Sequence, residues 1–216
     1  MKYKAIIFDL DGTLLDTIDD LADSMNGVLA RRGIPTHDVD KYKYFVGDGM
    51  STLVKRALPQ DISNDSLVSE CITEMREEYG KRWANKSCPY EGIPELLDML
   101  AAEGIKTAIL SNKPDEFTKI VVEKLLSRWK FEVVLGERSG IPKKPDPTGA
   151  MEIADLLNIP PEEFLYLGDT NTDMLTANAA GMYAVGVLWG FRKADELIKS
   201  GAQILLEKPV DLIEVL

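Results

Sequence analysis

Strand patterns and helix patterns alternate through the second half of the chain, and this alternation restricts the fold more than any other feature of the sequence. Short apolar runs predict strands at residues 105–110, 132–135, 164–167 and 183–187. Helical patterns lie between and around them, at 94–103, 114–126, 148–157 and 171–180. Such alternation is typical of a parallel sheet with helices on both faces. The sequence therefore predicts an α/β fold with a Rossmann-like parallel sheet.

A further apolar run at residues 4–8 predicts a strand that joins the same sheet. Between this strand and the next, residues 16–87 show helical patterns and no convincing strand. Helices are expected there at 16–32, 51–58 and 63–83. A length of 216 residues suits one core with a sizeable insertion. We therefore expect a core formed by residues 1–15 and 88–216, with an inserted all-helical domain at 16–87.

The inventory of reactive side chains excludes several kinds of chemistry. The chain has one histidine, His37, and two cysteines, Cys71 and Cys88. A metal site built from several histidines is excluded, and a Ser-His-Asp or Cys-His system would have to use His37. The cysteines lack C-x-x-C spacing, which disfavours thiol redox chemistry. The 36 Asp and Glu residues leave carboxylate chemistry, and oxygen ligands suit hard cations such as Mg2+.

Charge and hydropathy restrict the partners. A net charge of −11 and a pI of about 4.7 disfavour nucleic acids and anionic membrane surfaces. The apolar run near the N-terminus is too short for a signal peptide, and no stretch reaches the length that spans a bilayer. Two cysteines without a disulfide framework favour the cytoplasm. The oligomeric state does not follow from the sequence.

Polar residues follow the predicted strands repeatedly. They are Asp9 and Asp11 after the first strand, Ser111 after the second, Lys144 in the loop after the third, and Asp169 and Asp173 after the fourth. The carboxyl ends of parallel strands share one edge of a sheet, and ligands bind in the crevice there. We therefore expect residues about 160 positions apart to meet in one site.

The residue types indicate what such a site binds. Asp9, Asp169 and Asp173 would repel one another, by roughly 4 kcal/mol for two like charges near 4 Å at an effective dielectric of about 20. A hard divalent cation relieves this repulsion, and Mg2+ is commonly bound together with phosphate. Lys144 supplies one positive charge, and the main chain around Gly12 is suited to cradle a phosphoryl oxygen. The sequence therefore predicts a metal and a phosphate in the same site.

Each of these residues also has an ordinary structural interpretation. Aspartates after strands are frequent turn formers, and Asp173 is well placed to cap a helix that begins near Thr170. Asn112 is a possible N-cap and Ser111 a simple strand end. The joint occurrence of all of them in this order favours the functional interpretation.

The order of these motifs resembles that of the haloacid dehalogenase superfamily. Residues 9–14 (DLDGTL), 109–113 (ILSNK), 144–145 (KP) and 168–173 (GDTNTD) match its four motifs and span almost the whole chain. The first and fourth motifs are specific, whereas the second and third depend on correct placement. The resemblance implies that the helical insertion is a cap domain on the core.

The resemblance also implies roles for the site residues. Asp9 would be the nucleophile that attacks phosphorus, and Asp11 would protonate the leaving group and then activate water. Asp9, the main-chain carbonyl of Asp11, and Asp169 would hold Mg2+, with Asp173 in support. The implied phosphate-binding residues are Gly12, Ser111, Asn112 and Lys144.

Within this superfamily the chain is most similar to bacterial phosphoglycolate phosphatases, at residues 45–50 and 89–92 among others. The expected activity is Mg2+-dependent hydrolysis of a phosphomonoester through an aspartyl-phosphate, with phosphoglycolate as substrate. Alternatives are a phosphatase for another small metabolite (a sugar phosphate, a nucleotide or pyrophosphate), a phosphosugar mutase, or a non-catalytic binding protein.

The cap contributes a candidate substrate loop, Gly47-Asp48-Gly49, which would close over the substrate. The alternative is that these residues form only a helix-start turn. Asp48 places an acid near the expected position of a phosphorylated carboxylate unless its side chain points away. Candidates for contact with the far end of the substrate are Lys43, Lys55 and Arg56.

Overall fold

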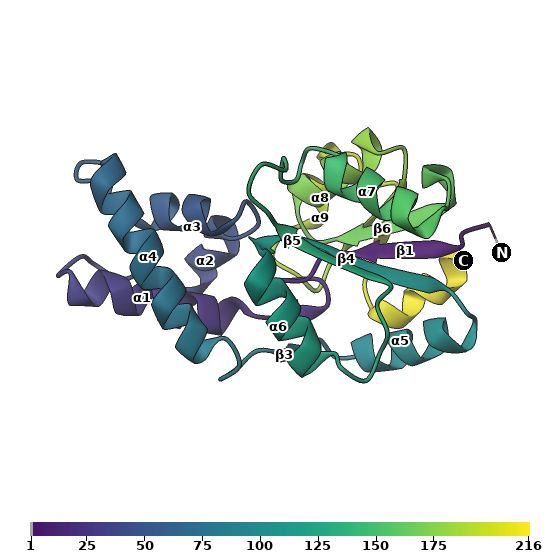
Figure 1. Ribbon diagram of the computed structural model, residues 1–216, viewed down its shortest axis with the longest axis horizontal. Helices are drawn as coiled ribbons and strands as arrows, with labels where there is room; N and C mark the ends of the chain where they lie inside the picture. The colour runs from purple at the N-terminus through teal and green to yellow at the C-terminus, as the bar shows by residue number, and fades with distance from the viewer. Residues whose placement is uncertain (1) are drawn as a thin grey trace.

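The computed structural model describes residues 2–216 and contains a six-stranded parallel sheet (Figure 1). The strands are β1 (Ala5–Phe8), β4 (Lys106–Pro114), β5 (Val133–Glu137), β6 (Phe164–Gly168), β7 (Tyr183–Val187) and β8 (Ile204–Leu206). Their spatial order is β5-β4-β1-β6-β7-β8, so β1 lies in the middle. Phe8 at the end of β1 pairs with Ile109 on one side and Leu167 on the other. The predicted α/β fold is confirmed, and β8 is an additional edge strand.

Helices cover both faces of the sheet (Figure 1). One face carries α5 (Ile93–Ala102), α6 (Asp115–Leu125) and the terminal 3-10 helix η2 (Pro209–Val215). The other face carries α7 (Thr148–Leu157), α8 (Asn171–Ala179) and α9 (Ala194–Lys199). A short 3-10 helix, η1 (Pro161–Glu163), precedes β6. Side chains alternate along β1: Ile6 and Phe8 pack into one apolar cluster, Ala5 and Ile7 into the other. All four are fully buried, as expected for a strand covered on both sides.

A helical unit lies in the chain between β1 and β4. It contains α1 (Ile18–Arg31), α2 (Val39–Phe45), α3 (Met50–Ala57) and α4 (Asp65–Arg82). These helices pack around an apolar cluster of their own, with Met25, Leu29 and Tyr42 fully buried. The sequence patterns missed α2, which is short and has one fully buried side chain, Tyr42, anchored by a 2.7 Å hydrogen bond to Asn26 Oδ1.

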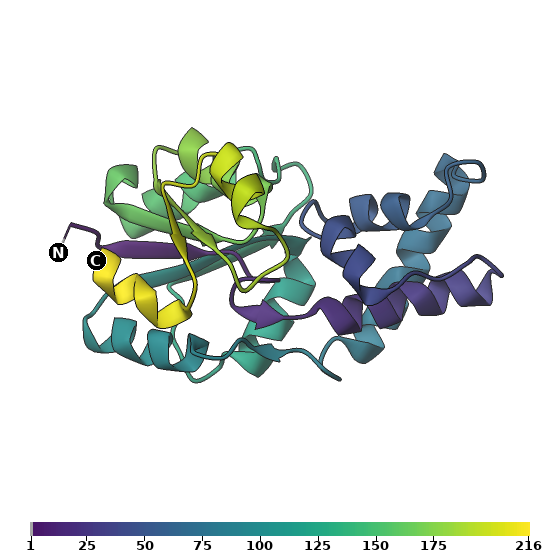
Figure 2. The same ribbon diagram turned by 180° about the vertical axis from the view of Figure 1, so that it is seen from behind.

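The chain enters and leaves the helical unit side by side, through the antiparallel strands β2 (Leu15–Asp16) and β3 (Cys88–Pro89). The unit lies at one end of the elongated molecule, and both chain termini lie at the opposite end (Figures 1 and 2). No helix within residues 2–216 is long and apolar enough to cross a membrane.

Candidate active site

Three aspartates and one lysine meet beyond the carboxyl edge of the sheet. Asp9 follows β1, Asp169 follows β6, and Asp173 lies in the first turn of α8. One carboxylate oxygen from each lies within 4.8 Å of the other two. Lys144 Nζ donates to Asp9 Oδ1 and to Asp173 Oδ1, at 2.7 Å each, and to the carbonyl oxygen of Leu110 at 3.0 Å. The structure thus brings together residues that follow three separate strands in the sequence, β1, β5 and β6.

Asp173 serves two purposes in this cluster. Its Oδ2 accepts hydrogen bonds from the main-chain N–H and the hydroxyl of Thr170, which completes a capping box at the start of α8. Its Oδ1 remains free to accept the bond from Lys144. From the sequence, helix capping and a place in the site are alternative roles for Asp173. In the structure Asp173 has both roles.

Burial makes this cluster electrostatically strained. Burial and the charge of Asp173 raise the pKa of Asp169 to about 7, although the N–H of Phe191 opposes the shift. Burial also raises the pKa of Asp9, with Asp173 and Asp169 adding to the effect against the attraction of Lys144. Burial alone would lower the pKa of Lys144, but Asp173 and Asp9 raise it above its usual value. One lysine facing three buried carboxylates leaves negative charge uncompensated, so this donor set fits a hard divalent cation such as Mg2+.

Gly12 allows the first loop to approach the acidic cluster. A Cβ at this position would lie 2.4 Å from Asp169 Oδ2, and φ is +93°. The N–H of Gly12 donates to the carbonyl oxygen of Leu15 at 2.8 Å, so it is already occupied. Within residues 2–216, the N–H groups of Leu10 and Asp11 have no acceptor, and they are the groups of this loop that remain available to a phosphoryl oxygen.

Asp11 is held by a lysine to which the sequence patterns assign no role. Lys113 Nζ lies 2.6 Å from both carboxylate oxygens of Asp11, and Thr17 Oγ1 donates to Asp11 Oδ1 at 2.7 Å. Lys113 is buried, and its ammonium also lies 4.9 Å from the ring centroid of Tyr79 in α4. Burial alone would lower the pKa of Lys113, but the charge of Asp11 raises it, so Lys113 keeps its proton.

Ser111 and Asn112 point in different directions. Ser111 Oγ accepts from the N–H of Lys113 at 3.2 Å. Asn112 Nδ2 donates to the carbonyl oxygens of Gly47 and Lys144, at 3.0 Å each, and Asn112 Oδ1 accepts from the N–H of Lys144 at 2.9 Å. The side chain of Asn112 therefore connects β4, the Lys144 loop and the Gly47 loop, and both of its N–H donors are used there. A role of Asn112 in phosphate binding stays a prediction.

The loop at residues 47–49 touches the core and also starts a helix. Gly49 is the N-cap residue of α3, with φ +86°. Asp48 Oδ1 accepts from Thr172 Oγ1 at 2.8 Å, and Asp48 Oδ2 pairs with Arg56 Nη2 at 2.6 Å. Burial would raise the pKa of Asp48, but Thr172 and Arg56 lower it. The Asp48 carboxylate, which would repel an anionic substrate, is thus turned towards Thr172 and Arg56.

Arg192, which the sequence interpretation did not single out, also joins the core to the helical unit. Its guanidinium donates to the carbonyl oxygen of Lys43 and, at 3.1 Å, to that of Val46. It also lies over the ring of Tyr44, 5.1 Å from the centroid. The neighbouring Phe191 N–H donates to Asp169 Oδ2 at 2.8 Å, so one loop contacts both the acidic cluster and the helical unit.

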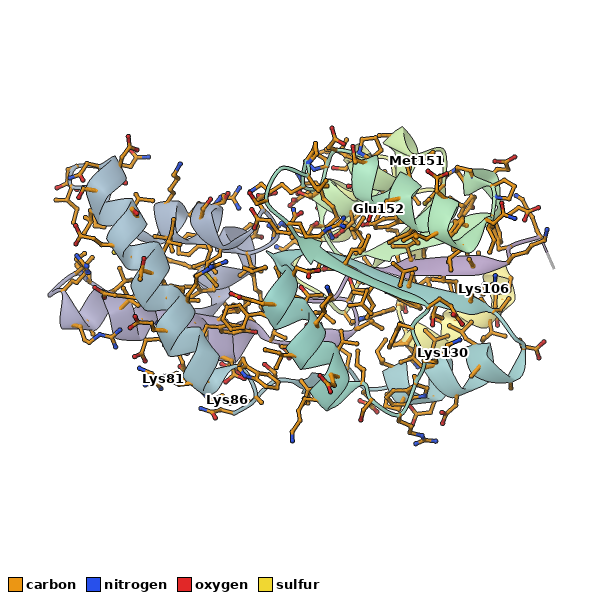
Figure 3. All side chains as sticks on the ribbon, in the orientation of Figure 1. Lys81, Lys86, Lys106, Lys130, Met151 and Glu152 are labelled. Atoms are coloured by element: carbon orange, nitrogen blue, oxygen red, sulfur yellow. The ribbon has the colours of Figure 1, made fainter. Side chains whose placement is uncertain are left out.

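A cavity of about 40 Å³ lies between the acidic cluster and the helical unit. Its core-side lining includes Asp9, Asp11, Ser111, Asn112 and Lys113; its helical side consists of Leu21, Val46, Gly47, Gly49, Met50, Leu53, Met75 and Tyr79. Lys43, Lys55 and Arg56 are not among its lining residues. Lys81 and Lys86, near the lower edge of the helical unit, point outward (Figure 3). The helical unit therefore offers this cavity an apolar surface with a single hydroxyl, that of Tyr79.

Comparison with known proteins agrees with this geometry. Residues 6–187 match the family model described as haloacid dehalogenase-like hydrolase, and the chain belongs to this family. It is similar to the phosphoglycolate phosphatase of Psychrobacter arcticus, at 32% identity over 203 residues, covering 91% of this chain and 88% of the relative. It is also similar to the phosphoglycolate phosphatase of Aquifex aeolicus, at 30% identity, covering 99% and 96%.

The fold leads to the same class of protein. A crystal structure from Lactobacillus delbrueckii subsp. bulgaricus, described as that of a candidate phosphoglycolate phosphatase, superposes with a TM-score of 0.93 at 31% identity. It covers 100% of this chain, which in turn covers 98% of that structure. The predictions of this family, its fold and a phosphatase are confirmed.

Proposed function

We propose that this phosphatase hydrolyses phosphoglycolate, with Mg2+ and through a phosphorylated Asp9. The observation that carries the proposal is the placement of two carboxylates, Asp9 and Asp11, in the lining of one small cavity beside a buried acidic cluster. The relatives named phosphoglycolate phosphatase support the choice of substrate. The small cavity, about 40 Å³, favours a compact substrate.

Asp9 acts as the nucleophile. Lys144 holds Asp9 Oδ1, and the other oxygen of Asp9 attacks phosphorus as the bond from phosphorus to the ester oxygen breaks. Asp11, fixed by Lys113 and Thr17, gives its proton to the departing ester oxygen and later takes a proton from the water that cleaves the aspartyl-phosphate. All three N–H donors of Lys144 are engaged by protein oxygens, so its main role here is to orient Asp9.

The phosphoryl oxygens are received by groups that the protein leaves unpaired. These are the N–H groups of Leu10 and Asp11 and the hydroxyl proton of Ser111, for which residues 2–216 offer no acceptor. Asp9, the carbonyl of Asp11, and Asp169 would hold Mg2+, which would offset charge on the phosphoryl group when bound. Asp173 supports the site through Lys144.

We further propose that residues 16–87 act as a cap domain on a core formed by residues 1–15 and 88–216. Phe117 and Phe191 of the core pack into the apolar cluster of α1–α4, which supports a position of this unit over the site. With the bonds from Asn112, Thr172 and Arg192, these contacts hold the cap closed and exclude water from the cavity. A cytoplasmic enzyme without nucleic-acid or membrane partners stays a prediction from charge and composition.

The test is hydrolysis of a panel of phosphate esters with Mg2+ and with EDTA. The wild type is expected to favour phosphoglycolate over sugar phosphates, nucleotides and pyrophosphate, and to require Mg2+. Asp9→Asn is expected to lose hydrolysis by at least about 10⁴-fold while remaining folded. Asp61→Asn, the same change at an exposed position, should keep wild-type activity.

Turnover that survives Asp9→Asn would show that Asp9 is not the nucleophile. A strong preference for sugar phosphates or nucleotides would overturn the choice of substrate and leave the chemistry intact. Trapping of labelled phosphate on the wild type, and its absence from Asp9→Asn, would test the aspartyl-phosphate directly.

A further inference from the structure

We propose that Lys113 and Tyr79 together recognise the carboxylate of the substrate, and that this pair forms only when the cap is closed. The inference rests on the proposed function and names the residues that select its substrate. One partner comes from the core, after Ser111 on β4, and the other comes from α4 in the cap. Both line the cavity that holds Asp9 and Asp11.

Lys113 has a hydrogen-bond donor to spare. A lysine ammonium carries three N–H donors; two of those of Lys113 meet the oxygens of Asp11, and the side chain of Tyr79 also lies beside the ammonium. The ammonium is buried and cannot turn to bulk water. A third donor is therefore left for an acceptor that enters the cavity.

Tyr79 presents an unpartnered hydroxyl to the same cavity. Its Oη is buried and has no hydrogen-bond partner in the part of the chain that the structure describes. The ring is fixed by an edge contact with Phe117, at 5.3 Å between centroids. Burial raises the pKa of Tyr79 to about 12, so the hydroxyl keeps its proton and can donate. A buried polar group without a partner is rare in folded proteins, and a ligand would satisfy this one.

The distances suit a carboxylate close to the ester oxygen. Asp11 must touch the ester oxygen in order to protonate it, and Lys113 Nζ lies 2.6 Å from both Asp11 oxygens. In phosphoglycolate a single CH2 group separates the ester oxygen from the carboxylate. A carboxylate at this spacing falls within reach of Lys113 while Asp11 contacts the ester oxygen. The same ion pair can thus place the general acid and select the substrate.

The negative charge of the substrate carboxylate also points to Lys113. A carboxylate buried against Leu21, Met50 and Leu53 needs a cation or strong donors nearby. None of the three cationic candidates in the cap lines this cavity: Lys43 pairs with Asp40, Arg56 pairs with Asp48, and Lys55 is exposed. Among the described lining residues, Lys113 is the cation that faces this cavity.

The experiment compares phosphoglycolate with ethyl phosphate, which has a methyl group in place of the carboxylate. The readout is the ratio of kcat/KM for the two esters, so that damage to Asp11, which affects both esters, cancels. Lys113→Met is expected to lower this ratio about 10- to 100-fold. Tyr79→Phe, which keeps the ring and its packing, is expected to lower it about 5- to 10-fold. Lys124→Met, an exposed lysine on α6, should leave the ratio unchanged.

A longer substrate tests the spacing. Phosphorylated 3-hydroxypropionate carries its carboxylate one carbon further away, and its kcat/KM relative to ethyl phosphate should change less than about 3-fold in Tyr79→Phe. If Lys113→Met and Tyr79→Phe lower both kcat/KM values equally, Lys113 only positions Asp11 and the inference is overturned. If the wild type hydrolyses other esters but not phosphoglycolate, the proposed function itself fails.

Discussion

Replacing Gly12 by alanine adds one methyl group at the most crowded point of the site. The new Cβ would lie 2.4 Å from Asp169 Oδ2 and 2.7 Å from Asp169 Cγ, well inside van der Waals contact. Asp169 is fully buried and accepts hydrogen bonds from Thr13 Oγ1 and from the N–H of Phe191. It therefore has no free direction in which to retreat without breaking at least one of these bonds.

The expected loss of stability has two sources. At φ +93°, a Cβ strains the main chain by about 1–2 kcal/mol. Loss of one or both hydrogen bonds to the Asp169 carboxylate adds about 1.5–3 kcal/mol for each bond. Gly33 is a matched control, because its φ is +67° and a Cβ there meets nothing within 4 Å. Gly33→Ala should show the backbone strain alone.

Urea unfolding of both variants gives the comparison, with kcat measured in Mg2+ as a second readout. Gly12→Ala should be less stable than Gly33→Ala by at least about 1.5 kcal/mol. It should also lose at least about 100-fold in kcat, because Asp169 moves, whereas Gly33→Ala keeps wild-type activity. Equal stabilities, or a Gly12→Ala enzyme with wild-type kcat, would refute the close approach of this loop to Asp169.

Two further predictions concern the charges of the cluster. Lys144→Met leaves Asp9 and Asp173 buried without their cation, so it should lower the free energy of unfolding in EDTA by about 3–5 kcal/mol, and added Mg2+ should recover part of this loss. The raised pKa of Asp169, about 7 against 3.8, means that the folded state binds this proton more tightly between these pH values. In EDTA, the contribution of Asp169 to stability should therefore fall with rising pH, by up to about 1.4 kcal/mol per unit. Urea titrations of wild type and Asp169→Asn at pH 5 and pH 7 measure this; equal pH slopes for the two proteins would contradict the shift.

The elements of the core were predictable because their residue patterns are local. The central strands are short apolar runs buried on both faces, and the first helix ends at Arg31, one residue before its predicted end. What the patterns missed depends on contacts distant in the chain. The helix α2 is fixed by Tyr42 against Asn26, and β8 is a three-residue edge strand whose apolar run, Ile204–Leu206, is too short to recognise alone.

The residues of the site divide in the same way, into those that local patterns indicate and those that depend on distant contacts. One further local signal lies in the alternation of side chains along β4. Successive residues in a strand point to opposite faces, so Ser111 and Lys113 share one side and Asn112 points to the other. In the structure Lys113 contacts Asp11 and the side chain of Asn112 bonds to the Lys144 loop, although Ser111, Asn112 and Lys113 all line the same cavity. Alternation along β4 would therefore have assigned Lys113 to the site together with Ser111.

No comparable signal exists for the contacts between the core and the helical unit. The acceptors offered by the helical unit are mostly main-chain oxygens: those of Lys43 and Val46 for Arg192, and that of Gly47 for Asn112. A main-chain carbonyl is present at every residue, so the side chains of the helical unit do not reveal these bonds. The side-chain contact of Asp48 with Thr172 joins residues 124 positions apart, beyond any local pattern. These contacts therefore depend on the shape that α1–α4 adopt around their apolar cluster, and substitution of a core residue such as Arg192 would test them.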